Sequence, residues 1–239
     1  MANSAYAFPT AVTQGGTGLA TLTTAYGVVC AGTTATGNLQ NAGPGAAGQV
    51  LTSAGAAALP TWAASAGVGS MIYISTGTAA GSATIDFTGL TNAYSAYLIM
   101  IDKVNSSTDA VTLTFRTSTN NGVAYDAGAS DYRWDNLFIS QNSVAGQYSE
   151  ADTSITLSGG SHISNVANEV YSANVWIFNP SAAGFTRIVT QASYLSATPS
   201  SSTCAGGGTR VSVTPVNAVR FLMSAGNIAA GTFKLYGII

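Results

Sequence analysis

YLIMIDKVNSSTDAVTLTF, residues 97–115, contains two of the clearest strand patterns in the chain. Residues 97–101 are apolar at every position, which is typical of a strand covered on both faces, with a neighbouring subunit as one candidate cover. Residues 111–115 alternate apolar side chains with threonine, as a strand with one buried face does. The stretch therefore predicts β structure, and the sequence around it extends that prediction.

Similar runs rich in β-branched and aromatic residues continue to the end of the chain, separated by Gly, Asn, Ser and Pro turns. No stretch of ten or more residues shows a 3.6-residue apolar period with helix caps. About nine or ten strands at this spacing favour a β-sandwich or jelly roll over a barrel. Besides Tyr97–Ile101 and Val111–Phe115, the predicted strands are Met71–Ile74, Tyr132–Ile139, Val170–Phe178, Phe185–Tyr194, Arg210–Val213, Val219–Met223 and Phe233–Ile238.

The first 85 residues contain no Asp, Glu, Lys, Arg or His, and Asp86 is the first charged residue. An ordinary soluble domain is about a quarter charged. A membrane-spanning helix needs about 20 mainly apolar residues in a row, whereas Thr, Ser, Asn, Gln and Gly interrupt every apolar run here. Met1–Thr10 has neither the basic start nor the apolar core of a signal peptide. We therefore expect no membrane insertion, and assembly in a cytoplasm.

An imperfect repeat in this uncharged region favours order over a disordered tail. Gly27–Gly32 is followed by small residues and then Asn38–Gln40, and 21 residues on Gly48–Ser53 is followed by small residues and then Leu59–Trp62. Each copy reads as a short strand, a glycine turn and a second short strand.

Self-association would account for the lack of charge in such a region. If three copies wind about one axis, a charge near that axis would face two like charges out of water, which is costly. Small residues let the backbones approach, and strand edges pair between chains. A homotrimeric fibrous segment is therefore expected, and a flexible linker is the alternative.

The composition changes near Ser65–Gly69, which predicts two modules. Residues 1–66 would be an attachment and trimerisation segment with short β repeats, and residues 67–239 an all-β sandwich domain. With a net charge of −2 and no Lys/Arg cluster, no nucleic-acid partner is expected. Cys30 and Cys204 are far apart in sequence and predict no disulfide framework. One histidine and no Cys-x-x-Cys predict neither a metal site nor a cofactor.

Three motifs resemble the N-terminal part of bacteriophage tail fibres and related receptor-binding proteins. Thr13–Gly18 contains the Gln-Gly-Gly-Thr-Gly signature, which in that family precedes a Gly-x-Val-Leu repeat and a Leu-Pro-x-Trp ending. Gly48–Ser53 and Leu59–Trp62 are similar to those two elements, and Gly231–Ile238 is similar to a terminal strand of the family. The motifs cover about a quarter of the chain and are specific in combination.

The resemblance implies a virion protein that forms a homotrimer. Its N-terminal part would join other virion proteins, and its C-terminal part would meet a glycan or protein of the host surface. Gly15, Gly16, Thr17, Gly18 and Trp62 would then serve attachment and trimerisation. Long fibres have extended shafts that this chain lacks, so a short tail fibre, a tail-tip protein or a head-attached fibre is implied.

Tyr125–Asn136 is the most site-like segment because it combines ionisable groups with aromatic rings. Sugar recognition uses ring faces against C–H patches and carboxylates against hydroxyls. The candidate ligand-binding residues are Tyr125, Asp126, Asp131, Arg133, Trp134 and Asp135. Period-two alternation places Tyr132 and Trp134 on one face, with Asp131, Arg133 and Asp135 on the other. The structural alternative is that the two rings fill the core while Arg133 pairs with a flanking Asp.

Other polar stretches carry weaker signals. Asn179–Gly184 and Ala197–Gly208 have the composition of exposed turns. Gly206–Gly208 is not followed by Lys-Ser/Thr, which excludes a phosphate-binding loop. His162 stands in a polar glycine turn and is expected to be a solvated loop residue.

The sequence favours a non-enzymatic protein. No two carboxylates are seen to converge as glycoside hydrolysis requires, and no Gly-x-Ser-x-Gly elbow precedes a helix. The function that fits is a phage appendage protein that mediates host attachment through its C-terminal β domain. A structural head fibre or decoration protein without receptor binding is the first alternative, and a glycan-cleaving tailspike is the second.

Overall fold

The computed structural model describes residues 25–31, 39–56, 58–64, 71–141, 143–160 and 162–239. The chain divides into two compact units, Met1–Val68 and Gly69–Ile239. The expected module boundary between residues 66 and 67 falls among residues 65–70, outside the described residues. None of the described residues forms a helix long and apolar enough to cross a membrane.

The described residues of the first unit form two short antiparallel strand pairs. β1 (Val29–Cys30) pairs with β2 (Gln40–Asn41), and β3 (Gln49–Thr52) pairs with β4 (Thr61–Ala64). Each copy of the sequence repeat provides one of these pairs.

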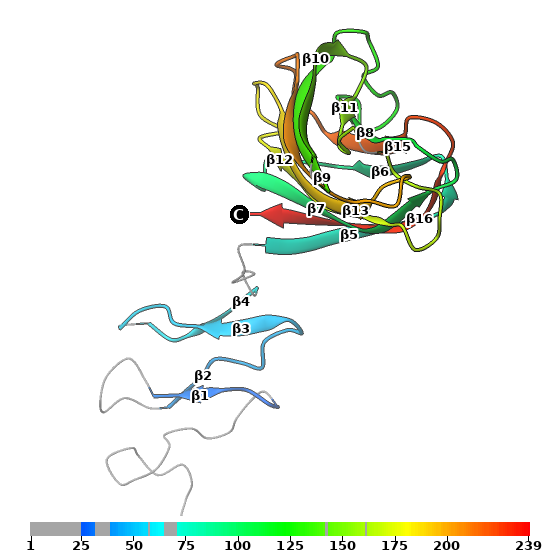
Figure 1. Cartoon of the computed structure of the whole chain (residues 1–239). Helices are drawn as coiled ribbons and strands as arrows, with labels where there is room; N and C mark the ends of the chain where they lie inside the picture. Colours follow the sequence, from blue (N-terminus) through cyan, green and yellow to red (C-terminus); the bar gives the residue numbers. More distant parts are fainter. Residues whose placement is uncertain (1–24, 32–38, 57, 65–70, 142, 161) are drawn as a thin grey trace, which may run out of the picture. The chain divides into compact units, whose positions relative to one another are not determined.

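The second unit is an all-β sandwich of two antiparallel sheets (Figure 1). The larger sheet has eight strands in the order β10-β9-β14-β13-β12-β7-β16-β5, and the smaller has four in the order β11-β8-β15-β6. The strands are β5 (Met71–Ser82), β6 (Thr84–Thr88), β7 (Ala96–Ser106), β8 (Leu113–Ser118), β9 (Tyr132–Ser140), β10 (Ser143–Asp152), β11 (Ile155–Thr156), β12 (Tyr171–Phe178), β13 (Arg187–Leu195), β14 (Ser201–Arg210), β15 (Ala218–Met223) and β16 (Ile228–Ile238).

The core lies between the two sheets. Three completely buried rings meet there: Phe115 and Phe221 from the smaller sheet and Phe233 from the larger. The ring centroid of Phe221 lies 5.4 Å from that of Phe115 and 5.1 Å from that of Phe233. Tyr97, Ile99 and Ile101 of β7 point into this core because alternate residues of a strand share a face.

The opposite face of β7 is only partly covered. Leu98 is 6% exposed, but Met100 is 41% exposed. The expectation that residues 97–101 are covered on both faces is therefore wrong at Met100.

Two predictions about the region around residue 205 are also wrong. Ala197–Gly208 was expected to be an exposed turn, yet Ser201–Arg210 forms β14, an interior strand of the larger sheet between β13 and β9. Arg210–Val213 was expected to be a strand, but only Arg210 belongs to one.

Small side chains are required in β14 because neighbouring groups occupy the space beside it. A Cβ on Gly206 would lie 2.5 Å from the backbone oxygen of Asp135 and against the side chain of Asn136. A Cβ on Gly208 would lie 2.8 Å from Cδ1 of Ile155. In Figure 1 the β10-β9-β14 side of the sheet curves around the smaller sheet. The glycines thus permit close packing where strand propensity alone would not predict a strand.

Replacing Gly206 by alanine is expected to lower the free energy of unfolding by about 1–3 kcal/mol, because the added methyl group overpacks the sheet. Gly146→Ala in β10 is the matched control, since its Cβ would lie 3.8 Å from the nearest atom, the oxygen of Asn136. Urea unfolding of both variants measures the difference. Equal stability of the two variants would contradict this account of β14.

Candidate functional site

The face of the larger sheet that points away from the core, here the outer face, carries the candidate site. The strand registers align one outward residue from each of the eight strands in a single row. In sheet order the row is Tyr148, Asp135, Gly207, Val189, Trp176, Leu98, Tyr236 and Tyr73. Tyr148 is 73% exposed and Val189 is 43% exposed. The row therefore offers apolar surface to a partner or ligand.

A depression of about 700 Å³ lies beside this row on β16, β7, β12 and β13. Most of its lining side chains are polar and come from the outward positions of the strands. They include Asp102, Ser172, Asn174, Gln191, Ser193, Thr232 and Lys234, with Met100 as an apolar member. We call this the amide depression, after Asn174 and Gln191.

Several polar groups of the amide depression are available to a ligand. The side chains of Asn174, Gln191 and Lys234 make no hydrogen bond or ion pair with any described residue. Ser172 Oγ donates to Asp102 Oδ1 at 3.4 Å and accepts from the backbone N–H of Lys103 at 3.2 Å. The depression thus presents amide, ammonium, carboxylate and hydroxyl groups together.

A β-bulge in β7 shapes the rim of the amide depression. The registers with β12 and with β16 both shift between Ile101 and Asn105, and Lys103 has a left-handed φ of 53°. This conformation is unfavourable for a residue with a side chain and is often retained at functional sites. The bulge leaves two consecutive residues, Asp102 and Lys103, exposed and returns Val104 to the core.

A second depression, of about 660 Å³, lies on β10, β9, β14 and β13. Its lining includes Arg133, Asp135, Tyr148, Glu150, Arg187, Val189, Gly207 and Thr209. We call it the arginine depression. Gly207 leaves its centre free of a side chain.

The charges of the arginine depression are weakly paired. Arg133 Nε donates to the backbone oxygen of Glu150 at 3.1 Å and lies 3.8 Å from its Oε2. The side chains of Asp135 and Arg187 have no partner among the described residues. All of these groups remain open to a ligand.

The structure separates the six predicted ligand-binding residues of the second unit. Arg133 and Asp135 lie in the arginine depression. Trp134 also contributes to the lining of that depression, but its ring packs against the core and its Nε1 donates to Asp152 Oδ2 at 2.9 Å. Tyr132 and Trp134 thus share the inward face, and Arg133 and Asp135 the outward face, as the alternation predicted. The predicted pairing of Arg133 with a flanking Asp is wrong, because its partner is Glu150.

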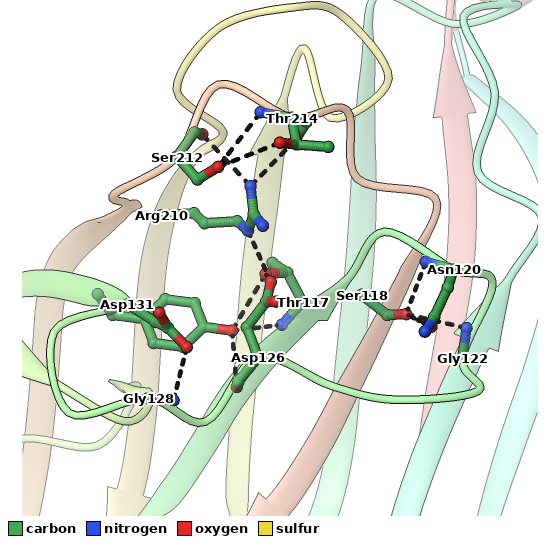
Figure 2. Close-up of polar contacts among 11 residues, drawn as sticks. Thr117, Ser118, Asn120, Gly122, Asp126, Gly128, Asp131, Arg210, Ser212 and Thr214 are labelled. Atoms are coloured by element: carbon green, nitrogen blue, oxygen red, sulfur yellow. Dashed lines mark hydrogen bonds and ion pairs between the residues drawn. The ribbon is translucent and has the colours of Figure 1, made fainter.

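Asp126 and Asp131 belong to a polar network at the end of β8 and β14 (Figure 2). Asp126 Oδ2 accepts from Arg210 Nε at 2.6 Å and from Thr117 Oγ1 at 2.8 Å. The Tyr132 hydroxyl accepts from the backbone N–H of Thr117 at 2.7 Å, and burial raises the pKa of Tyr132 to about 12. Asp131 Oδ2 accepts from the backbone N–H of Gly128 at 2.6 Å. These contacts hold the loop before β9 in place.

The side chain of Tyr125 points away from the Asp126 network and lies beside the smaller sheet, against Arg220 of β15. The guanidinium of Arg220 stacks 3.9 Å from the centroid of its ring. Arg220 also forms two hydrogen bonds to Asp86, of 2.8 Å and 2.6 Å. Burial, with the nearby charge of Asp86, raises the pKa of Tyr125 to about 12. One face of the Tyr125 ring is therefore occupied by Arg220.

Sequence reasoning missed the amide depression because its residues are scattered between positions 100 and 234. Their only shared signal is a polar residue at an outward position of an otherwise apolar strand, as in Tyr171–Phe178.

Among the described residues, no three His, Cys, Asp or Glu side chains come close enough to hold a metal ion.

The predicted attachment residues Gly15, Gly16, Thr17 and Gly18 lie outside the described residues. Trp62 is on β4, where its Nε1 donates to the backbone oxygen of Gly43 at 2.9 Å. A Cβ on Gly45 would lie 2.6 Å from the ring of Trp62. Trp62 therefore orders the turn before β3, and its role in attachment stays a prediction.

Comparison of the chain with protein-family models, with curated proteins and with solved structures finds no match. The functional proposal therefore depends on the chemistry of the outer face and on the sequence motifs.

Replacing Arg210 by methionine is expected to lower the free energy of unfolding by about 3–5 kcal/mol, because it leaves a mostly buried carboxylate without its partner. The side chains of Arg210 and Asp126 are 8% and 24% exposed. Arg133→Met is the control: its pair with Glu150 is 61% and 76% exposed, so the expected loss is below about 1 kcal/mol. If urea unfolding gave the same loss of unfolding free energy for Arg210→Met and Arg133→Met, the buried Asp126–Arg210 pair would contribute no more to stability than the exposed pair.

Proposed function

We propose that the chain is a bacteriophage virion appendage, a short tail fibre or tail-tip protein, that attaches to the host surface through its C-terminal sandwich. The observation that carries this proposal is the amide depression, with unpaired Asn174, Gln191 and Lys234 side chains on an open sheet face. The motifs at Gly48–Ser53 and Leu59–Trp62, which resemble those of tail fibres, support it from the sequence side.

The chemistry of the amide depression suits a surface glycan. Sugar hydroxyls both donate and accept hydrogen bonds, so a mixture of donors and acceptors matches them better than charges of one sign. Asn174 and Gln191 offer both, Lys234 donates and Asp102 accepts. The apolar side chain of Met100 offers contact to sugar C–H groups.

A shallow, open depression binds weakly on its own. A homotrimer, held together by the uncharged N-terminal region, would present three copies and raise the apparent affinity without any new contact. The same region would join the trimer to other virion proteins. The protein would thus be assembled in the host cytoplasm and act on the virion, without catalysis.

Two alternatives each have an observation in their favour. Leu137, Ile139 and Val144 are 52%, 46% and 65% exposed on the outer face, as expected if a head fibre or decoration protein packed there against another virion protein. Asp135 and Glu150 both line the arginine depression, where a glycan-cleaving tailspike would need two carboxylates. Release of oligosaccharide from a bound polysaccharide would establish the tailspike.

The double variant Asn174→Ala/Gln191→Ala is expected to lose at least about tenfold in cell binding, because each lost amide leaves ligand hydroxyls unpaired. Flow cytometry of fluorescent full-length protein on a panel of bacterial strains measures it. Val123→Ala, at a loop residue 87% exposed, is the control and should bind normally. Normal binding by the double variant would show that the receptor site lies outside the amide depression. If the unaltered protein bound no strain, the head fibre or decoration protein would be favoured instead.

Light scattering of the full chain is expected to give about three times 24.0 kDa, because the uncharged N-terminal region is proposed to pair between chains. A mass near 24.0 kDa at micromolar concentration would contradict the trimer. The linker interpretation of residues 1–66 would then apply to the isolated protein.

A further inference from the structure

We propose that the amide and arginine depressions are two subsites of one site, which binds an extended, neutral oligosaccharide running across the strands of the outer face. This inference rests on the proposed attachment function and specifies its ligand.

The two depressions are continuous on the sheet. Gln191 lines the amide depression and Val189, two residues earlier on β13, lines the arginine depression. Both residues point outward, so they share one face. On the far side of β13, their partners Ala205 and Gly207 in β14 are too small to form a wall between the subsites.

The separation of the subsites requires a ligand longer than one sugar. The amide depression is centred near β7 and β12, and the arginine depression near β14 and β9. Three strand spacings separate these centres, which corresponds to about 14 Å along the sheet. A chain of several sugar rings spans this distance, whereas a single ring fills one subsite only.

The charge balance of the surface favours a neutral ligand. Arg133, Arg187 and Lys234 contribute three positive charges, and Asp102, Asp135 and Glu150 contribute three negative charges. Each depression contains both signs. A polyanion would therefore meet attraction and repulsion in both subsites and gain no net attraction, while neutral hydroxyls can pair with groups of either sign.

Apolar side chains stand where sugar rings would cross. Val189 is 43% exposed at the junction and Tyr148 is 73% exposed at the end of the arginine depression. Trp176, the cross-strand neighbour of Val189, is half-buried and stacks on Phe178 with ring centroids 6.4 Å apart. Such surfaces pack against the C–H faces of sugars, as an extended ligand needs.

The test begins with the full-length protein on an array of purified bacterial surface polysaccharides, neutral and acidic. Disaccharide and hexasaccharide fragments of the polysaccharide that binds are then titrated by calorimetry. The hexasaccharide is expected to bind at least about tenfold more tightly, because it alone reaches both subsites. Monovalent fragments remove the contribution of avidity.

Tyr148→Ala is expected to abolish the advantage of the hexasaccharide and to leave disaccharide binding in the amide depression unchanged. Tyr73→Ala is the matched control, because Tyr73 is an exposed tyrosine in the same row on the opposite edge strand and lies outside both depressions. Arg187→Ala is the second variant, and it too is expected to abolish the advantage of the hexasaccharide while leaving disaccharide binding unchanged. Thermal melting confirms that each variant is folded.

Three results would overturn the inference while leaving the attachment function in place. They are equal affinity for both fragments, an equal effect of Tyr148→Ala and Tyr73→Ala, and binding of acidic polysaccharides only. Absence of binding to every polysaccharide, despite binding to cells, would indicate a protein receptor. Absence of binding to polysaccharides and to cells alike would contradict the proposed attachment function itself.

Discussion

The packing of one face of the eight-stranded sheet against the four-stranded sheet is the interaction on which the rest of the second unit depends. Phe115, Phe221 and Phe233 meet at its centre without exposure to solvent, and each contributes about 1.5–3 kcal/mol from burial. Because side chains alternate along a strand, fixing the inward set also fixes the outward set. Tyr97, Ile99 and Ile101 enter the core, and Leu98 and Met100 must then face outward. The candidate site is therefore a consequence of the core.

Departures from a regular sheet give that outward face its shape. The bulge at Asp102–Lys103 leaves both residues exposed at the rim of the amide depression and returns Val104 to the core, with a left-handed φ at Lys103. In β14, Gly206 and Gly208 admit Asn136 and Ile155 on the inner side, and Gly207 leaves the outer side bare. The same glycine run thus serves the core and opens the arginine depression.

The sequence could predict those parts of the structure that depend on local patterns. Alternation placed Tyr132 and Trp134 together on one face, which the structure shows to be the inward one, and apolar runs located most of the strands of the second unit. β14 was missed because SSTCAGGGTR has the composition of a turn, and the need for small residues there comes from Asn136, Ile155 and other residues distant in sequence. The amide depression was missed for a related reason. Asp102, Asn174, Gln191 and Lys234 come together only through the order β16-β7-β12-β13, which no local motif encodes.

The appendage function that we propose requires both contact with neighbouring proteins and an open ligand site, and the outer face offers different positions along its strands for the two. On β9, Arg133 and Asp135 occupy one end, and Leu137 and Ile139 the other. Val144 lies opposite Ile139 and extends this apolar end to the edge strand β10. A protein partner covering Leu137, Ile139 and Val144 would bury apolar surface without crossing the row of Asp135 and Gly207. Surface packing and glycan recognition are thus compatible on one sheet, because the registers keep their side chains in separate rows.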